Sequence, residues 1–322
     1  MTPRRVLVIK FSALGDMVLA FPAFARIRAA HPSANITLLT TPPFADLARR
    51  APYFDAVETD GRPGGVIGWL RLIGRLRRAC YARVYDLQTN DRTGLIFHAL
   101  RPFPPTWSGV ARGCALPHRN PDRAAMHSLE RHAEQLRDAG IWPDAPTAAM
   151  SAPGPDVSWM LAPGPRDPSA RRKALLVPGA AARRPQKRWP AECYGALAAR
   201  LIAEGFDVDI VGGVQERPLA DLIRAAAPDA RDLTGATDVF DIAVLAAEAD
   251  LAVGNDTGPM HLIAAAGAPC IVLFSGVSDP ALSAPRGRVT VMRSENLHDL
   301  PPSAFEPVLK SYKNRAPSGS DR

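Results

Sequence analysis

The sequence contains two successive series in which short apolar segments alternate with amphipathic segments, and this pattern is the feature that most constrains the fold. In the first half the strand-like segments are residues 6–11, 36–41, 56–60 and 83–89, and helical spacing begins after the first of them over residues 16–30. The same order restarts at residue 174 and continues to residue 276. This βαβ order is typical of a parallel sheet covered by helices. It predicts an α/β chain with two Rossmann-like halves.

A segment rich in Pro, Ala, Gly and Ser separates the two halves. It covers residues 142–173 and has the composition of a linker. The expected domains are residues 1–165 and 166–322, which agrees with the length of 322 residues. Ligands of open α/β sheets bind outside the carboxyl ends of the strands, so we expect the two mostly parallel sheets to face a central cleft.

The overall charge favours an anionic partner. The formal net charge is +7 and the pI is about 9.6, which fits a nucleic acid, a phosphate-bearing small molecule or an anionic membrane surface. Because the arginines are dispersed and no nucleic-acid motif is present, a nucleic-acid partner is not expected. The four cysteines are scattered without a C-x-x-C pair, which predicts reduced thiols and no zinc site. With no signal-peptide pattern and no long apolar run, the expected location is the cytoplasm.

A glycine-containing turn follows the first predicted strand. The sequence SALGD, residues 12–16, leads into a helix whose free N–H groups and partial positive charge can attract an anion. Asp16 lies at the start of this helix, so a simple capping role is the alternative. The dinucleotide-binding pattern G-x-G-x-x-G is absent, which argues against a dehydrogenase.

A basic loop follows the first strand of the second half. Its cations are Arg183, Arg184, Lys187 and Arg188, and Pro190 is suited to begin the next helix. Cations repel the positive end of a helix dipole unless an anion lies between them. The loop therefore predicts a pyrophosphate site, with a solvated basic loop as the alternative.

The segment VGNDTGPMHLIAAAG, residues 253–267, joins a buried strand to an Ala-rich helix. Asp256 and Thr257 can cap this helix, Gly258 removes side-chain bulk, and His261 adds a donor in the first turn. Although D-T-G also occurs in aspartic proteases, those enzymes need two such aspartates, and this chain has one copy. The segment is interpreted as an anion cradle.

Three further acidic residues lie in or after predicted strands of the second half. Glu216 follows a strand and two glycines, where a carboxylate can accept hydrogen bonds from a ribose, and helix capping is the alternative. Asp207 and Asp209 form the D-x-D pattern of metal-dependent sugar transferases, but they lie inside a predicted strand. We therefore expect an exposed strand face there and no metal site.

Taken in order, these motifs resemble glycosyltransferase family 9, the bacterial heptosyltransferases of lipopolysaccharide core assembly. The likeness also includes YDLQTNDRTGLIFHAL, HSLERHAEQLRDAGI and VGGVQER, and it covers nearly the whole chain. It implies a GT-B fold with an acceptor-binding N-terminal domain and a nucleotide-sugar-binding C-terminal domain. It also implies inverting transfer without a metal or other cofactor.

The resemblance assigns roles to particular residues. Asp16 corresponds to the family's proposed general base. The donor-binding residues that it implies are Lys187, Glu216, Asp256, Thr257, Gly258 and His261. The candidates for acceptor contacts are Ser12, Arg92, Arg112 and Arg131. The loop 180–186 departs from the family because it has no Ser or Thr, and either backbone N–H groups or Arg183 and Arg184 are expected to replace those hydroxyls at the phosphates.

The expected reaction moves heptose from ADP-L-glycero-D-manno-heptose to a lipid-linked lipopolysaccharide core acceptor, either Kdo or heptose. A basic surface would help the enzyme meet the anionic inner membrane from the cytoplasmic side. The alternatives are a GT-B-like nucleotide-sugar epimerase or hydrolase, and an inactive nucleotide-sugar binding module.

Overall fold

The computed structural model describes residues 5–145, 153–161, 171–181 and 183–313. The chain forms two compact units. The first comprises Met1–Met160 with Ala281–Arg286, and the second comprises Leu161–Pro280 with Gly287–Arg322. The expected boundary between residues 165 and 166 lies outside the described residues.

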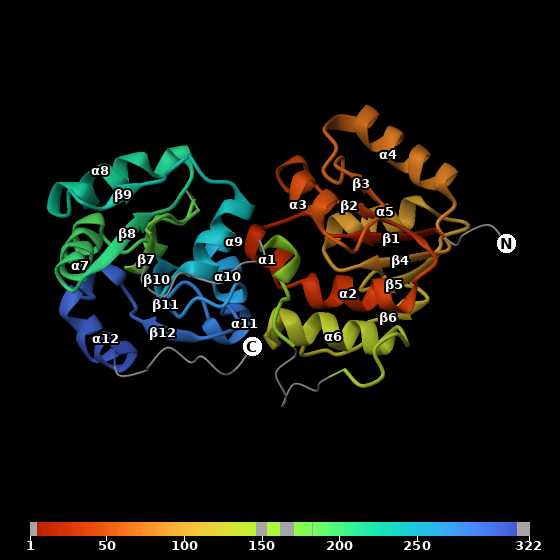
Figure 1. Ribbon diagram of the computed structural model, residues 1–322. Coiled ribbons are helices and arrows are strands. Elements are labelled where there is room, and N and C mark those ends of the chain that lie inside the picture. Colours follow the sequence, from red (N-terminus) through yellow and green to blue (C-terminus); the bar gives the residue numbers. More distant parts are fainter. Residues whose placement is uncertain (1–4, 146–152, 162–170, 182, 314–322) are drawn as a thin grey trace. The chain divides into compact units, whose positions relative to one another are not determined.

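The first unit is built on a six-stranded parallel sheet with the order β3-β2-β1-β4-β5-β6 (Figure 1). Its strands are β1 (Arg5–Ile9), β2 (Asn35–Leu39), β3 (Ala56–Glu58), β4 (Arg83–Asp86), β5 (Thr106–Gly109) and β6 (Leu116–Pro117). Its helices are α1 (Leu14–Val18), α2 (Phe21–Ala30), α3 (Ala45–Arg50), α4 (Gly65–Ala79), α5 (Asp91–Ala99) and α6 (Ser128–Asp138). Short 3-10 turns are η1 (Pro42–Phe44), η2 (Arg123–Ala125) and η3 (Ser158–Met160).

Alternating side chains of the central strand bind this sheet to helices on both faces. Leu7 and Ile9 of β1 belong to the apolar cluster that includes Leu72 of α4 and Phe97 of α5. Side chains of a strand alternate between faces, so Val8 is directed to the opposite face, where α2 and α6 pack together. Burial on both faces explains why β1 reads as a continuous apolar run.

The second unit repeats this architecture with the order β12-β11-β10-β7-β8-β9. Its strands are β7 (Arg172–Val177), β8 (Phe206–Ile210), β9 (Arg231–Asp232), β10 (Leu251–Asn255), β11 (Cys270–Phe274) and β12 (Val289–Arg293). Its helices are α7 (Ala191–Ala203), α8 (Arg217–Ala226), α9 (Val239–Glu248), α10 (Gly258–Ala265) and α12 (Glu306–Lys313), while α11 (Pro280–Ser283) lies where the chain passes between units. The short turns are η4 (Pro185–Lys187), η5 (Val214–Glu216), η6 (Leu297–Asp299) and η7 (Pro302–Phe305).

The predicted α/β fold with two parallel sheets is confirmed, with two local corrections. The helical segment expected over residues 16–30 is two helices, because α2 begins anew with Pro22 in its first turn. The exposed strand face expected at the D-x-D pattern is wrong for Asp209. This residue is only 4% exposed, and both of its carboxylate oxygens accept hydrogen bonds from Arg231.

Each sheet contains one point where the direction of strand succession reverses. In the first unit this point lies between β1 and β4, and in the second it lies between β7 and β10. The loops that leave neighbouring strands there run to opposite faces of the sheet, which opens a crevice at the carboxyl ends where ligands bind. The loops with the predicted site residues Asp16, Lys187 and Asp256 follow these strands.

Candidate active site

The centre of the second unit's site is a buried ion pair. The Lys187 ammonium, in η4 after β7, donates to the Asp256 carboxylate, which follows β10. Their side chains are only 11% and 7% exposed. The residues lie far apart in the sequence, but β7 and β10 are adjacent in the sheet, so the structure brings these two predicted donor residues together.

Asn255 organises the loops around that pair, and the sequence analysis did not select it. Its amide nitrogen donates to the carbonyls of Pro178 (2.8 Å) and Gly179 (3.2 Å). Its amide oxygen accepts from the backbone N–H of Trp189 (3.0 Å) and the hydroxyl of Tyr194 (3.2 Å). One fully buried side chain thus fixes the start and the end of the basic loop. Its place in the sequence, as a polar amide at the end of a buried strand directly before Asp256, could have indicated this role.

Glu216 lies between the loops that follow β7 and β8. Its carboxylate accepts a hydrogen bond from the Gly213 N–H (2.8 Å), so the capping contact considered as an alternative is present. A Cβ on Gly179 would lie 2.9 Å from Glu216 Cγ, and one on Gly212 would lie 3.0 Å from Glu216 Cβ. Glycine at both positions therefore makes room for this buried acid. Its role toward a ribose stays a prediction.

The start of α10 differs from the expected capping arrangement. Thr257 occupies the N-cap position with extended backbone, but its hydroxyl makes no cap hydrogen bond. That hydroxyl is buried and has no hydrogen-bond partner among the described residues. Capping by Asp256 is also wrong, because its carboxylate faces Lys187. With no side-chain cap at this helix start, the Gly258 N–H stays available for an anion, and the buried His261 lies in the same turn.

Asp16 lies in the short helix α1, directly after β1. Its carboxylate accepts a hydrogen bond from the Ala13 N–H (3.0 Å), which is the capping contact weighed for it. The side chain is half-buried. Next to this loop, the hydroxyl of Ser12 accepts a hydrogen bond from the guanidinium of Arg62, a residue that the sequence analysis did not select.

Two buried charges lie beneath the Asp16 loop and were also not predicted. Lys10 is 4% exposed and donates to the Leu87 carbonyl (3.2 Å). Burial lowers the pKa of Lys10 to about 8, while the charges of Asp16 and Asp86 oppose that shift. Burial also raises the pKa of Asp86 to about 6, against the hydrogen bonds it accepts from Thr89 and other neighbours. Sequence patterns give no signal for these shifts, since they arise from packing.

The predicted acceptor arginines occupy different places. Burial lowers the pKa of Arg131, and the charge of Asp16 opposes this shift, so Arg131 lies within electrostatic range of Asp16. Arg92 instead lies over the ring of Trp69, 5.8 Å from its centroid. Arg112 is exposed on the loop after β5. Of the four acceptor candidates, Ser12 and Arg131 are therefore the two that share the surroundings of Asp16.

Another unselected arginine adds positive charge to this edge of the first sheet. Arg123 in η2 donates to the hydroxyl of Thr89 (2.8 Å), directly after β4. The charges of Arg131 and Asp86 both affect its pKa, which burial lowers. Arg123 and Arg131 thus place two cations at the crevice between β1 and β4, a site suited to acidic groups on a ligand.

No group of three or more His, Cys, Asp or Glu side chains within residues 5–145, 153–161, 171–181 and 183–313 is arranged to hold a metal ion. In the same part of the chain, no helix combines the length and the apolar character needed to cross a membrane.

Comparison with known proteins identifies the class. The profile of glycosyltransferase family 9 (heptosyltransferase) matches residues 69–306, and the chain belongs to this family. It is 29% identical over 300 residues to lipopolysaccharide heptosyltransferase 2 of Escherichia coli (strain K12), covering 87% of this chain and 85% of the relative. The protein is therefore a glycosyltransferase.

Solved structures agree with this assignment. The ADP-heptose lipopolysaccharide heptosyltransferase II of E. coli superposes with a TM-score of 0.76 at 24% identity, covering 96% of this chain and 98% of that one. The E. coli heptosyltransferase WaaC, solved with ADP-2-deoxy-2-fluoro heptose, gives 0.71 at 20% identity and covers 95% and 99% of the two chains. The fold class is GT-B, as the resemblance implied.

Proposed function

We propose that this enzyme transfers heptose from ADP-L-glycero-D-manno-heptose to a lipid-linked lipopolysaccharide core acceptor, Kdo or heptose, with inversion and without a metal. The observation that carries the proposal is the Lys187–Asp256 pair beside the uncapped start of α10, at the crevice between β7 and β10. Together they form a cradle for a diphosphate. The names of the E. coli relatives support heptose, ADP and lipopolysaccharide as the chemistry involved.

In this proposal the C-terminal domain, residues 166–322, binds the donor. Lys187 and the N–H of Gly258 contact the diphosphate, with Thr257 and His261 as further donors, and Glu216 accepts from the ribose. When the anomeric C–O bond breaks, negative charge grows on the departing ADP. Donors that are already in place stabilise that charge without reorganisation. Asp256 holds Lys187 in position, since a carboxylate directed at a diphosphate would repel it.

The N-terminal domain, residues 1–165, binds the acceptor. Asp16 takes the proton from the acceptor hydroxyl as its oxygen attacks the anomeric carbon on the face opposite to ADP. Arg131 and Ser12 bind the acceptor next to Asp16, and Arg92 and Arg112 bind its outer acidic groups. General-base catalysis of this kind contributes about 10²- to 10⁴-fold to the rate.

The enzyme is also proposed to work in the cytoplasm, at the inner face of an anionic membrane. Its lipid-linked acceptor would be presented there, and the net charge of +7 favours that surface. No resident cofactor takes part in the proposed reaction, because the leaving group is stabilised by protein donors alone.

Release of ADP from ADP-heptose tests this function. We expect release only when a truncated core acceptor is present, whereas release without acceptor would indicate a hydrolase and tight donor binding without turnover would indicate a binding module. The variant Asp16→Asn should keep the affinity for ADP-heptose and lower kcat by at least about 10²-fold. The matched control is Asp46→Asn, because Asp46 is an exposed carboxylate in the first turn of α3. Unchanged turnover in Asp16→Asn would show that Asp16 is not the base.

A further inference from the structure

Helix α4 carries large apolar side chains that are exposed in the described part of its unit. Val66, Ile67 and Leu70 are 75%, 66% and 68% exposed. Their exposure does not result from poor packing of the helix, because the opposite side of α4 is buried in the core. Leu72 and Leu76 there are buried in the apolar cluster of the first unit. Three large apolar residues grouped on one exposed face mark an interaction surface rather than scattered surface residues.

The same face of α4 is positively charged. At about 100° per residue, Arg71 and Arg78 fall on the arc that also contains Ile67, and Arg77 falls on the arc of Val66 and Leu70. α4 contains no Asp or Glu. Among the described residues none of these three arginines forms an ion pair with a carboxylate. We call Val66, Ile67, Leu70, Arg71, Arg77 and Arg78 the α4 face.

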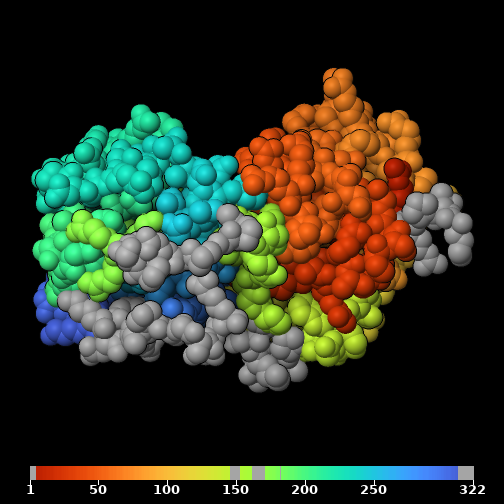
Figure 2. Space-filling view, viewed as in Figure 1, coloured from red at the N-terminus to blue at the C-terminus, as the bar shows by residue number. Residues whose placement is uncertain are grey.

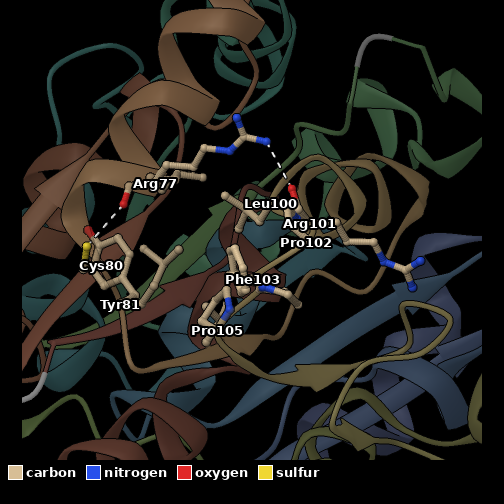
Figure 3. A pocket seen from close by; sticks show the side chains of 12 residues that line it. Arg77, Cys80, Tyr81, Leu100, Arg101, Pro102, Phe103 and Pro105 are labelled. Carbon is tan, nitrogen blue, oxygen red and sulfur yellow. Dashed lines mark hydrogen bonds between the residues drawn. The ribbon is translucent and has the colours of Figure 1, made fainter.

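An exposed aromatic residue extends this surface beyond the last turn of the helix. Arg77 donates to the carbonyls of Ala99 (2.7 Å) and Arg101 (3.2 Å), so the end of α4 is held against the loop before β5. Figure 3 shows the pocket at this junction, about 580 Å³ in volume, lined by Arg77, Arg101 and Phe103 among others. Phe103 is 91% exposed. Phe and Leu next to arginines are the residue types of amphipathic segments that bind at a membrane interface.

The start of α4 lies at the edge of the sheet that carries Asp16. The helix follows the carboxyl end of β3, and Arg75 of α4 forms ion pairs with Glu58 and Asp60 there. Arg62, just before the helix, donates to Ser12 in the Asp16 loop. In Figures 1 and 2 α4 and the residues before it form the orange upper margin of the first unit. The first apolar turn of α4, with Val66 and Ile67, therefore comes only a few residues after the segment that contacts the Asp16 loop.

We propose that the α4 face docks on an anionic lipid bilayer, with Val66, Ile67 and Leu70 inserted at the interface and the arginines among the lipid phosphates. An amphipathic helix with a basic polar side lies in the plane of the interface in this way. The inference deepens the proposed function and rests on it for the biological role, since a docked α4 would bring a lipid-linked acceptor to the Asp16 edge. Charge complementarity and the absence of carboxylates favour anionic lipid over a protein partner.

Vesicle co-sedimentation tests this proposal without donor or acceptor. The wild-type enzyme should bind vesicles of phosphatidylethanolamine and phosphatidylglycerol and should not bind vesicles of phosphatidylcholine. The variant Val66→Ser/Ile67→Ser/Leu70→Ser should bind the anionic vesicles at least about tenfold more weakly. Arg71→Gln/Arg78→Gln should weaken binding about 30-fold, because each arginine near an anionic surface contributes about 1 kcal/mol.

Control measurements separate docking from other effects. Leu222→Ser/Val291→Ser removes exposed apolar residues of the second unit and should bind vesicles as the wild type does. The α4 variants should transfer heptose to a short, soluble acceptor at the wild-type rate. If the triple variant binds anionic vesicles normally, the proposal is wrong. If light scattering instead shows that the triple variant has a lower molar mass in solution than the wild type, the α4 face binds a second copy of the chain. That result would also overturn the lipid proposal. The vesicle assay needs no turnover, and the transfer assay with a soluble acceptor needs no membrane. Lipid docking and heptose transfer can therefore each be disproved without affecting the test of the other.

Discussion

Replacing Lys187 by methionine removes the cation from the pair with Asp256 and leaves a carboxylate in a site where its side chain is only 7% exposed. Breaking a buried ion pair from one side costs about 3–5 kcal/mol, because the remaining charge has lost both water and its partner. Asp256→Ala likewise leaves the Lys187 ammonium buried without its partner carboxylate. The double variant Lys187→Met/Asp256→Ala buries neither charge, so its loss of unfolding free energy should be clearly smaller than the sum of the two single losses.

Thermal and urea unfolding of the ligand-free enzyme measure this coupling. The fluorescence of Trp189, which is buried in the second unit, reports on the relevant part of the chain. For a unit of this size each kcal/mol lowers Tm by about 2–4 °C. The matched control is Lys173→Met, whose partner in the same unit is Glu248 and whose side chain is 30% exposed. A pair so open to solvent should contribute at most about 1 kcal/mol.

Binding of ADP separates the two roles assigned to the pair. Lys187→Met should weaken ADP binding about 10- to 100-fold, the effect of losing one hydrogen bond to a charged group. Asp256→Ala keeps the ammonium but removes the group that holds it in position, so its folded fraction should bind ADP more weakly than the wild type and more tightly than Lys187→Met. Strictly additive losses of stability in the two single variants would refute the coupling, and unchanged ADP affinity in Lys187→Met would refute its contact with phosphate.

Two further substitutions test a buried side chain in the first unit and a close backbone contact in the second. Since the folded pKa of Asp86 (about 6) lies above the ordinary 3.8, the carboxyl binds its proton more tightly when folded, so its contribution to stability is present below about pH 4 and is lost by pH 6. The unfolding free energy of the wild type, measured relative to that of Asp86→Asn, should fall by about 3 kcal/mol as the pH rises from about 4 to 6. If urea titrations show the same difference between the two proteins at every pH, this prediction is wrong. Gly179→Ala should push Glu216 aside and weaken ADP binding about tenfold, whereas Gly94→Ala, with open space at its Cβ, should not. Equal affinities by calorimetry would argue against Glu216 as a ribose contact.

The sequence analysis was most successful for local order along the chain. The strands were recognisable because central parallel strands are buried on both faces, which forces continuous apolar runs such as residues 270–274. The positions of Asp16, Lys187 and Asp256 in loops after strands followed from the same periodicity. The family resemblance added roles for these residues, and the comparisons confirm the family and the fold class.

Side-chain contacts could not be read from the sequence. Helix capping was expected of Asp256 because Asp often caps helices, but the neighbouring strand brings an ammonium close enough to compete for its carboxylate. Asp209 was expected on an exposed strand face because its D-x-D pattern lies inside a predicted strand, but Arg231 on the adjacent strand forms two hydrogen bonds with it and offsets its burial. In both cases the partner comes from a distant segment, which periodicity along the chain does not reveal.

The sequence alone therefore determined the alternation of strands and helices and which polar side chains stand at the ends of strands, since these depend on spacing of two or about 3.6 residues along the chain. Only the tertiary structure decided what those side chains meet. The order β12-β11-β10-β7-β8-β9 makes Asp256 the partner of Lys187, and burial beneath the Asp16 loop shifts the pKa values of Lys10 and Asp86. Charge interactions and desolvation depend on distance in space and on the exclusion of water, and both are established when the sheets assemble.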